Sequence, residues 1–372
     1  MAITFESEPN NYNPSGNPIT YVFSSDQTGQ ANFSFKVETI LNGSVVSEDR
    51  VFVEVSNRAH FDCSPVVINL LQKPRLTTDL ETNMDTIYTL QLRVTELYGD
   101  PVAEEATLTS ATQYTIAASL PNDDWKTFTF NYLNNKWLTD VPNNTFKVIE
   151  GQDVIASILT NASQSFTINF YDSSEAILDT YVSPATFYRL RQLNLSDNNL
   201  LVIYGGSSFD DVASFDVQVG GSEVLTFIYV EQECYNIHSL VWLNKYGTFD
   251  QYPIEHNVTE KTSIESRSFK KKYGSWVGDN YLYDFNNAGD TDFEKTMTDN
   301  GSLVTNYMND VTQNWFVSAY ESPQAYLYDT NGLQYRLRIT GSSYTKKKGR
   351  FDDLIMEELE YSKSMNRRSV KL

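Results

Sequence analysis

Two short motifs in the sequence contain residue types that bind zinc. His60-x-x-Cys63 places an imidazole near a thiol, and Cys234-x-x-x-His238 repeats the combination farther along the chain. Together they would supply two sulfur and two nitrogen ligands, the set of a closed tetrahedral zinc site. The halves fall in different expected domains, however, and a free buried cysteine is common. We therefore expect no zinc site, and a disulfide between these cysteines is not favoured because disulfide frameworks need more cysteines at closer spacing.

A second candidate metal site is the acidic loop that begins at Asp284. Its sequence is Asp284-x-Asn286-x-x-Gly289-Asp290-x-Asp292, with glycine at the sixth position as in an EF-hand. An EF-hand also needs a bidentate acid at position twelve, where this chain has Lys295. A calcium-binding turn of another kind stays open beside the simpler interpretation, a solvated polar loop.

Adjacent carboxylates offer the residue types of glycoside hydrolysis, in which two acids flank the scissile bond. They stand at Asp123-Asp124, Asp210-Asp211 and Asp352-Asp353. Neighbouring acids in turns are usually solvated surface, however. A Ser-His-Asp mechanism would depend on one of only 3 histidines, and the chain has neither a Gly-x-Ser-x-Gly elbow nor a glycine-rich phosphate loop. The sequence thus predicts no enzyme and no cofactor.

Exposed tryptophans would allow a different kind of site, because flat rings bind sugars through apolar area at low entropic cost. Trp125, Trp137 and Trp276 are the candidates. A tryptophan in a strand is more often part of the core. Glycan binding therefore remains the alternative and not the first interpretation.

The charge of the chain narrows the class of partner. It has 28 Lys and Arg against 48 Asp and Glu, a formal net charge of −20. Such a surface repels nucleic acid and anionic membranes, so we expect neither as a specific partner. Basic residues are concentrated in the last segment, at Lys261, Arg267, Lys270, Lys271, Lys272, Lys346, Lys347, Lys348, Arg350, Arg367, Arg368 and Lys371. They form either a solvated face or a surface complementary to an acidic neighbour.

The composition predicts a mainly β fold. The chain has 372 residues, 40% hydrophobic and 13% aromatic, with many Thr, Ser, Asn and Tyr that favour strands joined by polar turns. This length predicts more than one domain. The first six residues lack the basic and apolar regions of a signal peptide, and no run is long enough to span a membrane. We expect synthesis in a cytoplasm and a soluble product.

Residues 1–18 read as an extended arm. Pro9, Pro14 and Pro18 fix φ and remove hydrogen-bond donors, so this stretch is not expected inside a sheet. We interpret it as a strap laid on a neighbouring subunit.

Residues 19–104 are predicted to form a β-sandwich of immunoglobulin-like character. Strands are expected at 20–24, 32–38, 50–55 and 87–97, with Phe33 and Phe35 in the core and a hairpin turn at Asn42-Gly43. Ser64 is placed as the cap of a short helix, with Pro65 at its first position.

Residues 105–232 are predicted to form a second β domain. The expected strands are 114–117, 127–132, 165–171, 200–204 and 224–230, separated by Asn-Asn and Gly-Gly pairs. No strict period is visible, so a repeat protein is not predicted.

Residues 233–345 are predicted to form a third, β-rich domain. Strands at 239–243 and 249–255 surround a Lys245-Tyr246-Gly247 turn, with Trp242 in the core. Helical spacing of apolar residues, including Trp315, predicts a helix over 310–320. Residues 354–361 fit neither a helix nor a strand cleanly, and 346–372 are expected to form a basic hairpin and tail.

Several of these segments resemble virion structural proteins of tailed phages of Bacteroidota, including crAss-like phages. The resemblance covers the first 75 residues and the last 140, and rests on the arm, the 32–43 hairpin, the 61–67 helix start, the 242–250 run, Trp315, and the segments at 321–327, 335–344 and 354–361. These are packing and turn motifs. The resemblance implies a tail, neck or baseplate component, and it favours a strand at 354–361.

The sequence therefore predicts a non-enzymatic building block of a phage virion. It would form a homo-oligomeric ring in the tail or neck, in the region that connects portal and tail, and contact other tail or neck proteins. The alternative is a host-attachment protein whose exposed aromatic residues bind glycan.

Overall fold

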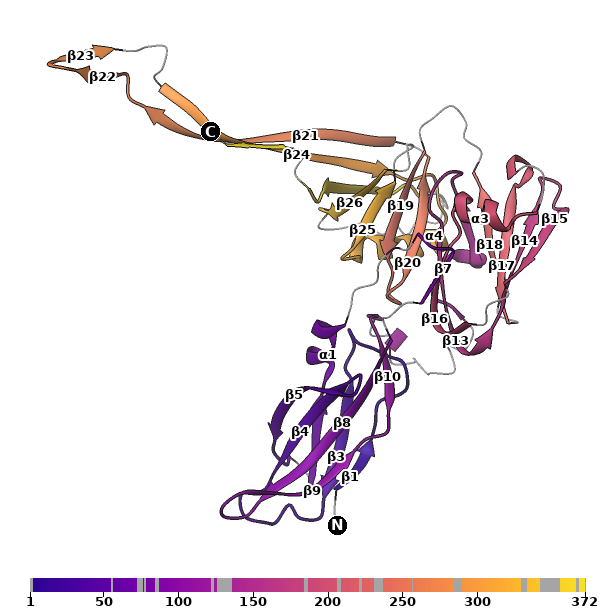
Figure 1. The fold of residues 1–372 in the computed structure, drawn as a ribbon, viewed down its shortest axis with the longest axis vertical. Coiled ribbons are helices and arrows are strands. Elements are labelled where there is room, and N and C mark those ends of the chain that lie inside the picture. Colours follow the sequence, from indigo (N-terminus) through magenta and orange to yellow (C-terminus); the bar gives the residue numbers. More distant parts are fainter. Residues whose placement is uncertain are drawn as a thin grey trace. The chain divides into compact units, whose positions relative to one another are not determined.

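The computed structural model describes residues 3–54, 56–71, 76, 78–83, 87–121, 124–125, 136–183, 187–205, 209–220, 223–230, 237–255, 257–283, 289–328, 333–341, 355–365 and 368–371. Antiparallel sheets dominate it, which confirms the prediction of a mainly β fold with several domains (Figure 1). The chain divides into two compact units. Unit 1 comprises Met1–Phe146, Asp153–Tyr229 and Leu243–Asp250, and unit 2 comprises Lys147–Gln152, Val230–Trp242 and Gln251–Leu372.

Unit 1 begins with a β-sandwich. One sheet has the order β1 (Ile3–Ser7), β3 (Thr20–Ser25) and β6 (Arg58–Asp62). The other has the order β2 (Asn13–Pro14), β10 (Gln113–Ile116), β8 (Ile87–Tyr98), β4 (Ser34–Leu41) and β5 (Ser44–Val51), with β9 (Ala103–Thr109) also paired to β8. The inward residues of both sheets share one core, in which Phe23 packs edge-on against Phe35 with ring centroids 4.9 Å apart. Phe33 is half-buried and packs against this core.

The hairpin between β4 and β5 forms where the sequence predicts it. Asn42 and Gly43 both have positive φ, 48° and 78°, as a two-residue turn matched to the strand twist requires. The second strand differs from the prediction, because β5 covers Ser44–Val51 and not residues 50–55. It starts directly after the turn, since residues 44–51 pair with β4.

The structure contradicts the prediction that residues 1–18 form a free arm. β1 pairs with β3, and β2 pairs in parallel with β10. Pro14 is buried at the edge of its sheet, where a residue without an N–H is tolerated. Pro9 is half-buried and Pro18 is exposed. The side-chain amide of Asn17 makes two hydrogen bonds of 2.8 Å with the backbone of Leu120. These bonds take the place of backbone hydrogen bonds that the prolines cannot make.

The short helix α1 (Ser64–Leu70) starts one residue differently from the prediction. Cys63 occupies the cap position, and the carboxylate of Asp62 accepts a hydrogen bond of 2.9 Å from the Ser64 backbone N–H. Asp62 therefore does the capping that the sequence assigns to Ser64, and Pro65 lies in the first turn as expected.

The rest of unit 1 contains two more sheets. The first has the order β11 (Lys136–Trp137), β13 (Ile155–Gln164), β16 (Phe187–Asn194) and β7 (Glu81–Asn83). The second, which we call sheet D, has the order β12 (Thr145–Val148), β18 (Leu225–Tyr229), β17 (Ser214–Val219), β14 (Phe166–Tyr171) and β15 (Ile177–Val182). Short 3-10 turns, η2 (Pro142–Asn144) and η3 (Phe209–Asp211), lie between strands.

The strand predicted at residues 200–204 is wrong, because this stretch belongs to the helix α3 (Asp197–Ile203). Its apolar run looks like a buried strand, but only Leu200 is buried, while Leu201 and Val202 are exposed. Ser196 occupies the N-cap position without a side-chain cap hydrogen bond, and Asp197 lies in the first turn, where a negative charge suits the helix dipole. The strand predicted at 127–132 lies outside the described residues.

Domain boundaries also differ from those predicted. The boundary between residues 104 and 105 would cut β9, which pairs with β8. β7 lies in the predicted first domain but pairs with β16 of the predicted second. Residues 243–250 belong to unit 1, whereas the sequence places them in the third domain.

Unit 2 is built on an 8-stranded sheet, which we call sheet E. Its order is β20 (Phe249–Ile254), β19 (His238–Leu243), β25 (Ala325–Tyr328), β26 (Gln334–Ile339), β27 (Glu358–Lys363), β24 (Gly289–Val304) and β21 (Asn257–Lys271), with β28 (Arg368–Lys371) also paired to β24. The helix predicted at 310–320 is present as α4 (Asp310–Glu321). Residues 358–361 of the ambiguous 354–361 segment belong to the strand β27, so the strand interpretation is correct for that part.

The core of unit 2 lies between sheet E and α4. Trp242 is fully buried, and its ring packs against Trp315 and Phe316 at centroid distances of 5.1 and 5.6 Å. Its indole N–H donates a hydrogen bond of 2.9 Å to the Ser318 hydroxyl. The aromatic residues of α4 recur at helical spacing, so one face of the helix covers the sheet.

Candidate functional site

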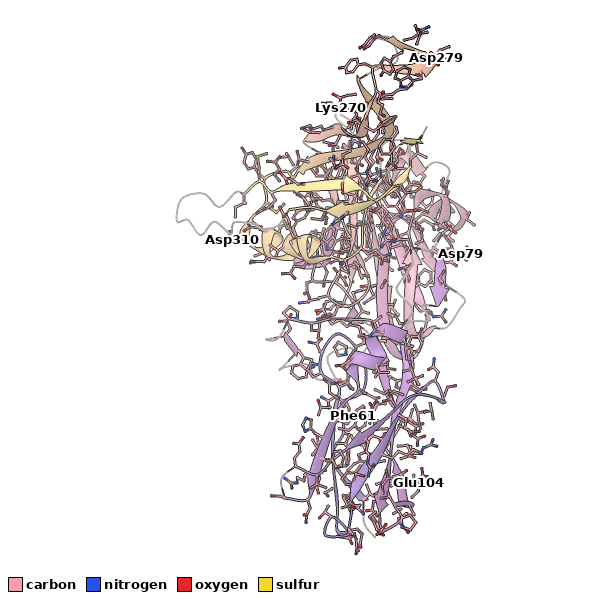
Figure 2. All side chains as sticks on the ribbon, turned by 90° about the vertical axis from the view of Figure 1, so that its left-hand side faces the viewer. Phe61, Asp79, Glu104, Lys270, Asp279 and Asp310 are labelled. Carbon is pink, nitrogen blue, oxygen red and sulfur yellow. The ribbon has the colours of Figure 1, made fainter. Side chains whose placement is uncertain are left out.

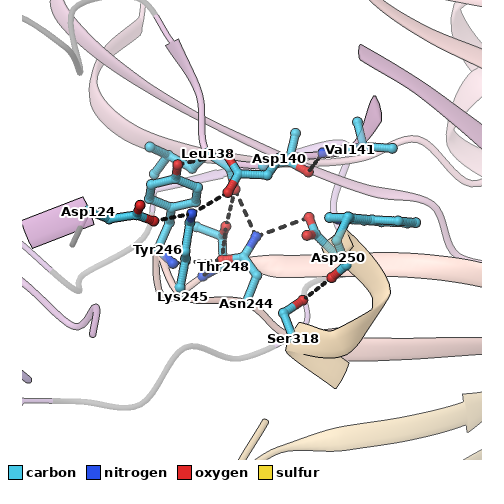
Figure 3. A network of polar contacts seen from close by, with 12 residues as sticks. Asp124, Leu138, Asp140, Val141, Asn244, Lys245, Tyr246, Thr248, Asp250 and Ser318 are labelled. Atoms are coloured by element: carbon cyan, nitrogen blue, oxygen red, sulfur yellow. Dashed lines mark hydrogen bonds and ion pairs between the residues drawn. The ribbon is translucent and has the colours of Figure 1, made fainter. Parts of the chain in front are cut away.

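A polar network surrounds the turn at residues 244–248 in unit 1 (Figure 3). The Asn244 amide donates to the Leu138 carbonyl and to Asp250, at 2.8 and 3.0 Å. Gly247 has φ of +73°, and a Cβ there would lie 1.8 Å from the Ala117 carbonyl oxygen. The turn is therefore pressed against neighbouring backbone, and only glycine fits.

Lys245 in this turn forms ion pairs with Asp124, at 2.6 Å, and with Asp140. Burial favours the neutral amine, but hydrogen bonds to these two carboxylates outweigh burial and raise the pKa of Lys245. The amine is thus charged at neutral pH, which suits an ion pair and not a general base. We interpret the network as a fastening of the turn.

The zinc ligands that the sequence offers are not brought together among the described residues. Cys63 is buried, and burial together with the nearby Asp62 charge raises the pKa of its thiol to about 12. His60 is exposed and faces Glu54 at 3.1 Å. Cys234 lies outside the described residues, and within them no group of three or more His, Cys, Asp or Glu side chains is arranged to hold a metal ion.

The other chemical motifs are scattered. Asp124 is used in the ion pair with Lys245, and Asp210 and Asp211 lie in η3. Asp123, Asp352, Asp353 and the calcium-loop residues 284–288 lie outside the described residues, and Asp290 and Asp292 belong to β24.

The three tryptophans considered for glycan binding have different environments. Trp137 is buried, and its indole N–H donates a hydrogen bond of 2.8 Å to the Glu223 carbonyl. Trp125 is partly buried against a core cluster of unit 1. Trp276 is 70% exposed, on the segment described next.

A long two-stranded hairpin, which we call the β-arm, projects from sheet E (Figure 1). It consists of β21, with 15 residues, and β24, with 16 residues, paired from Asn257↔Val304 to Lys271↔Gly289. β27 pairs with the base of β24 at residues 300–304, and β28 pairs with residues 294–297. Beyond these contacts, no other described strand pairs with either strand of the β-arm.

Leu303 at the base of the β-arm is buried, whereas three apolar side chains farther along it are exposed. Ile264 is exposed, and Phe269 and Phe293 are exposed with ring centroids 6.2 Å apart. Phe293 is the extra residue where the register shifts between Arg267 and Ser268, so a bulge places it beside Phe269. The bulge thus holds an apolar contact between two rings that remain partly in water.

The tip of the β-arm, residues 273–283, carries a second small hairpin. β22 (Gly274–Val277) pairs with β23 (Asn280–Tyr283), and the loop residue Gly278 has φ of +60°. The Trp276 and Tyr281 rings meet edge to face at 5.4 Å, and Tyr281 meets Tyr283 at 5.2 Å. A Cβ at Gly274 would lie 2.8 Å from the Tyr281 ring, so that ring covers the glycine. One face of the tip is thus an aromatic ladder.

Basic residues lie next to this ladder. Lys270, Lys271 and Lys272 are exposed and form no salt bridge among the described residues, although Asp290 lies opposite Lys270 across the strands. Figure 2 shows Lys270 on the β-arm and Asp279 at its tip. The other predicted basic interaction residues, Lys346, Lys347, Lys348 and Arg350, lie outside the described residues. The β-arm therefore places the predicted basic cluster at residues 270–272 next to Trp276, Tyr281 and Tyr283. The sequence alone did not indicate that these residues lie together.

Comparisons with known proteins give no family. No protein-family model and no curated protein matches the chain. A solved structure titled "Anomalous substructure of Titin-A168169" has a TM-score of 0.26 at 11% identity, over 62% of this chain and all of its own. The plexin A4 extracellular region has a TM-score of 0.19 at 8% identity, over 98% of this chain and 40% of its own. The native form of E. coli alpha-2-macroglobulin has a TM-score of 0.18 at 8% identity, over 100% of this chain and 34% of its own.

Those TM-scores are too low to support an argument about function. The functional interpretation therefore depends on the geometry of the β-arm and not on these structures. Within the described residues, no helix has both the length and the apolar character needed to cross a membrane.

Proposed function

We propose that the protein is a non-enzymatic structural component of a phage virion that joins neighbouring subunits through its β-arm. The observation that carries the proposal is the β-arm itself: two long strands, of which β21 is largely exposed and β24 largely half-buried, ending in an exposed aromatic tip. We place it in a homo-oligomeric ring of the tail or neck, in the region that connects portal and tail, or in a baseplate.

The stability of the β-arm is the physical basis of this proposal. β27 and β28 support β24 at residues 300–304 and 294–297, but the outer end of the β-arm and its tip have only two strands among the described residues. A two-stranded hairpin without a second layer is at best marginally stable in water. Binding to a neighbour would supply that layer and bury Trp276 and Phe269. The cost of ordering the hairpin would then be met during assembly, as it is for other segments that order on binding.

Charge supports assembly between like subunits. The chain has a net charge of −20, so copies repel one another unless a basic surface meets an acidic one. Lys270, Lys271 and Lys272 form such a basic surface on the β-arm. Head-to-tail contacts of this kind close into rings when the rotation between subunits permits.

The virion assignment rests on the resemblance of the terminal segments to phage structural proteins, and the β-arm takes over the role that the sequence analysis gave to residues 1–18. The basic residues at 346–350 remain a second proposed contact. Particle proteins of this kind are made in the host cytoplasm and end in the virion.

Changing the charge of the β-arm tests this proposal. The variant Lys270→Glu/Lys271→Glu/Lys272→Glu should fold with unchanged circular dichroism but fail to enter particles, as measured by mass spectrometry of purified virions. The matched control is Arg336→Glu/Arg338→Glu, which alters exposed cations on β26 of the same unit. Purified particles without any peptide of the unmodified chain, or with the β-arm variant at normal copy number, would contradict the proposal.

A second candidate function is glycan binding during host attachment. The exposed Trp276 beside Tyr281 and Tyr283 favours it, because a row of aromatic rings can stack on sugars. Negative-stain images separate the two functions: rings support the structural role, and slender trimers that bind a glycan array support attachment.

A further inference from the structure

The outer strand of sheet D has the properties of an open docking edge. β15 ends the sheet, and no described strand pairs with its outer side. Ile177 is 62% exposed and Val182 is 58% exposed, although both belong to the strand. Exposed apolar residues on an unpaired edge are a template for another strand.

Comparison with β5, another edge strand of unit 1, shows that this exposure is not a general property of the protein. β5 carries Glu48, Asp49 and Arg50 in sequence, and charged residues protect an edge from pairing. β15 has the sequence Ile-Leu-Asp-Thr-Tyr-Val, with one charge and neither lysine nor proline. Its single acid, Asp179, is occupied by a hydrogen bond of 2.6 Å from the Gly205 backbone N–H. β15 therefore lacks protection by a charged run or a proline, although a bulge at Leu178 interrupts its pairing with β14.

The helix α3 ends next to β15 and carries exposed apolar residues of its own. The bond between Gly205 and Asp179 holds the C-terminal end of α3 beside β15. Leu201 and Val202 on the helix are exposed, Val202 to 85%. We call the exposed residues of β15 and α3 the β15–α3 surface: Ile177, Leu178, Val182, Leu201 and Val202.

The strands of sheet D beyond β12 and the helix α3 carry acids but no lysine or arginine. No lysine or arginine occurs in residues 148–188 or 192–244, which contain sheet D beyond β12 and all of α3. The same ranges contain acids at 150, 153, 172, 175, 179, 197, 210, 211, 216, 223, 231 and 233. An acidic surface with an apolar edge is complementary to the aromatic tip of the β-arm together with Lys270, Lys271 and Lys272 just before it.

We infer that the tip of the β-arm of one copy of this chain docks on the β15–α3 surface of a second copy. The inference rests on the proposed structural function and names the partner surface. The tip hairpin adds its strands beside β15, in the manner of β-strand addition, and its aromatic ladder covers the exposed apolar residues. Lys270, Lys271 and Lys272 then approach the acidic face of sheet D.

A second copy is favoured as the occupant because one chain carries both complementary surfaces. Tip and edge are different patches, so the contact is heterologous and each subunit both gives and receives. The acidic face also repels an acidic partner that lacks such a basic segment.

Disulfide trapping tests the contact between copies. In a Cys234→Ser background, one copy carries Ser275→Cys, on the face of the tip opposite the aromatic ladder, and the other carries Ile177→Cys, while native Cys63 is buried. Under mild oxidation the pair should form an intermolecular disulfide, with a yield at least about tenfold above the control, because docking raises the effective concentration of the thiols. The matched control replaces Ile177→Cys with Val45→Cys, an exposed position on the charged edge β5.

The outcomes separate this inference from the proposed function. Equal yields for the two pairs, or a disulfide within a single chain when both cysteines are placed together, would overturn the docking of a second copy. The proposed function would survive that result if the β-arm charge variant still failed to enter particles. A charge exchange gives independent support: Glu175→Lys/Asp211→Lys in one copy should restore crosslinking to a copy that carries the three lysine-to-glutamate changes.

Discussion

Unit 2 contains two aromatic clusters of similar composition and opposite environment. Trp242, Trp315 and Phe316 pack between sheet E and α4, and Trp242 is fully buried. Trp276, Tyr281 and Tyr283 pack on a two-stranded tip, and Trp276 is 70% exposed. Both clusters have ring centroids between 5.1 and 5.6 Å apart. The rings therefore contact one another equally well in both places.

The difference lies in the layers around the rings. A strand pair becomes part of a core only when a second layer covers its apolar face. The helix α4 supplies that layer for Trp242, whereas no described element covers the tip. An aromatic cluster without a second layer is suited to receive one from another molecule. The buried cluster therefore stabilises the fold of unit 2. The exposed cluster is suited to bind another subunit.

The largest effect is expected from truncating the buried cluster. Trp242→Ala removes a fully buried side chain and should lower the free energy of unfolding by about 3–5 kcal/mol. Urea denaturation measures the change, with Trp276→Ala as the matched tryptophan on the tip. A loss below about 1 kcal/mol for Trp242→Ala would place this residue outside the core.

A pH effect is also expected in the buried cluster. Tyr252 packs 5.3 Å from Phe316, and burial together with the Glu255 charge raises its pKa to about 12. Because the folded pKa exceeds the unfolded value of about 10, the stabilisation is complete below pH 10 and is lost as the pH rises to about 12. The free energy of unfolding should fall by up to about 1.4 kcal/mol per pH unit over that range for this group. Tyr252→Phe should reduce the slope, and an unchanged slope would show that Tyr252 does not contribute.

A smaller effect is expected at the start of α4. The Asn309 side chain accepts a hydrogen bond of 2.8 Å from the Thr312 backbone N–H and caps the helix. Asn309→Ala should cost about 1 kcal/mol, because one orphan donor loses its partner. Thermal unfolding measures this cost. Asn309→Asp, which keeps the acceptor, should stay close to the unmodified protein, and an equal loss in both variants would argue against the cap.

The smallest stability effect is expected on the tip. Trp276→Ala should change the free energy of unfolding by less than about 0.5 kcal/mol, as for other surface substitutions. Chemical denaturation beside Trp242→Ala makes the comparison direct. A large loss would mean that the tip is packed within its own chain.

The sequence was sufficient where local chemistry determines the structure. Asn42-Gly43 predicts a hairpin because few residues adopt positive φ in succession, and the turn is found. The spacing of Trp315, Phe316 and Ala319 predicts the helix α4 because this period buries one helical face. These signals depend on neighbouring residues alone.

The sequence was insufficient where long-range partners decide. The apolar run after Asn199 looks like a strand, yet it forms α3, whose Asp197 accepts a hydrogen bond of 2.7 Å from the Tyr229 hydroxyl of β18. The prolines of the N-terminal segment seem to exclude a sheet, but β10 offers an edge that tolerates Pro14. Neither partner can be found from the local pattern.

The candidate site was predicted only in part. Lys270, Lys271 and Lys272 were identified from their charge, and Trp276 was named as a glycan candidate. The β-arm that contains them was not predicted, because its two strands are mostly polar on both faces. They therefore lack the alternation of apolar and polar residues that identifies a strand in a sequence. Gly278-Asp279 between Trp276-Val277 and Tyr281-Leu282 is the signal that would have found the tip hairpin.

The measurement that tests the central claim most directly is the incorporation of a tip variant into particles. Trp276→Ala/Tyr281→Ala/Tyr283→Ala removes the aromatic ladder and leaves the buried cluster of unit 2 intact. The account predicts a folded protein with an unfolding midpoint close to that of the unmodified chain and a copy number in purified particles near zero. Incorporation of this variant at the normal copy number would show that the β-arm does not join the subunits.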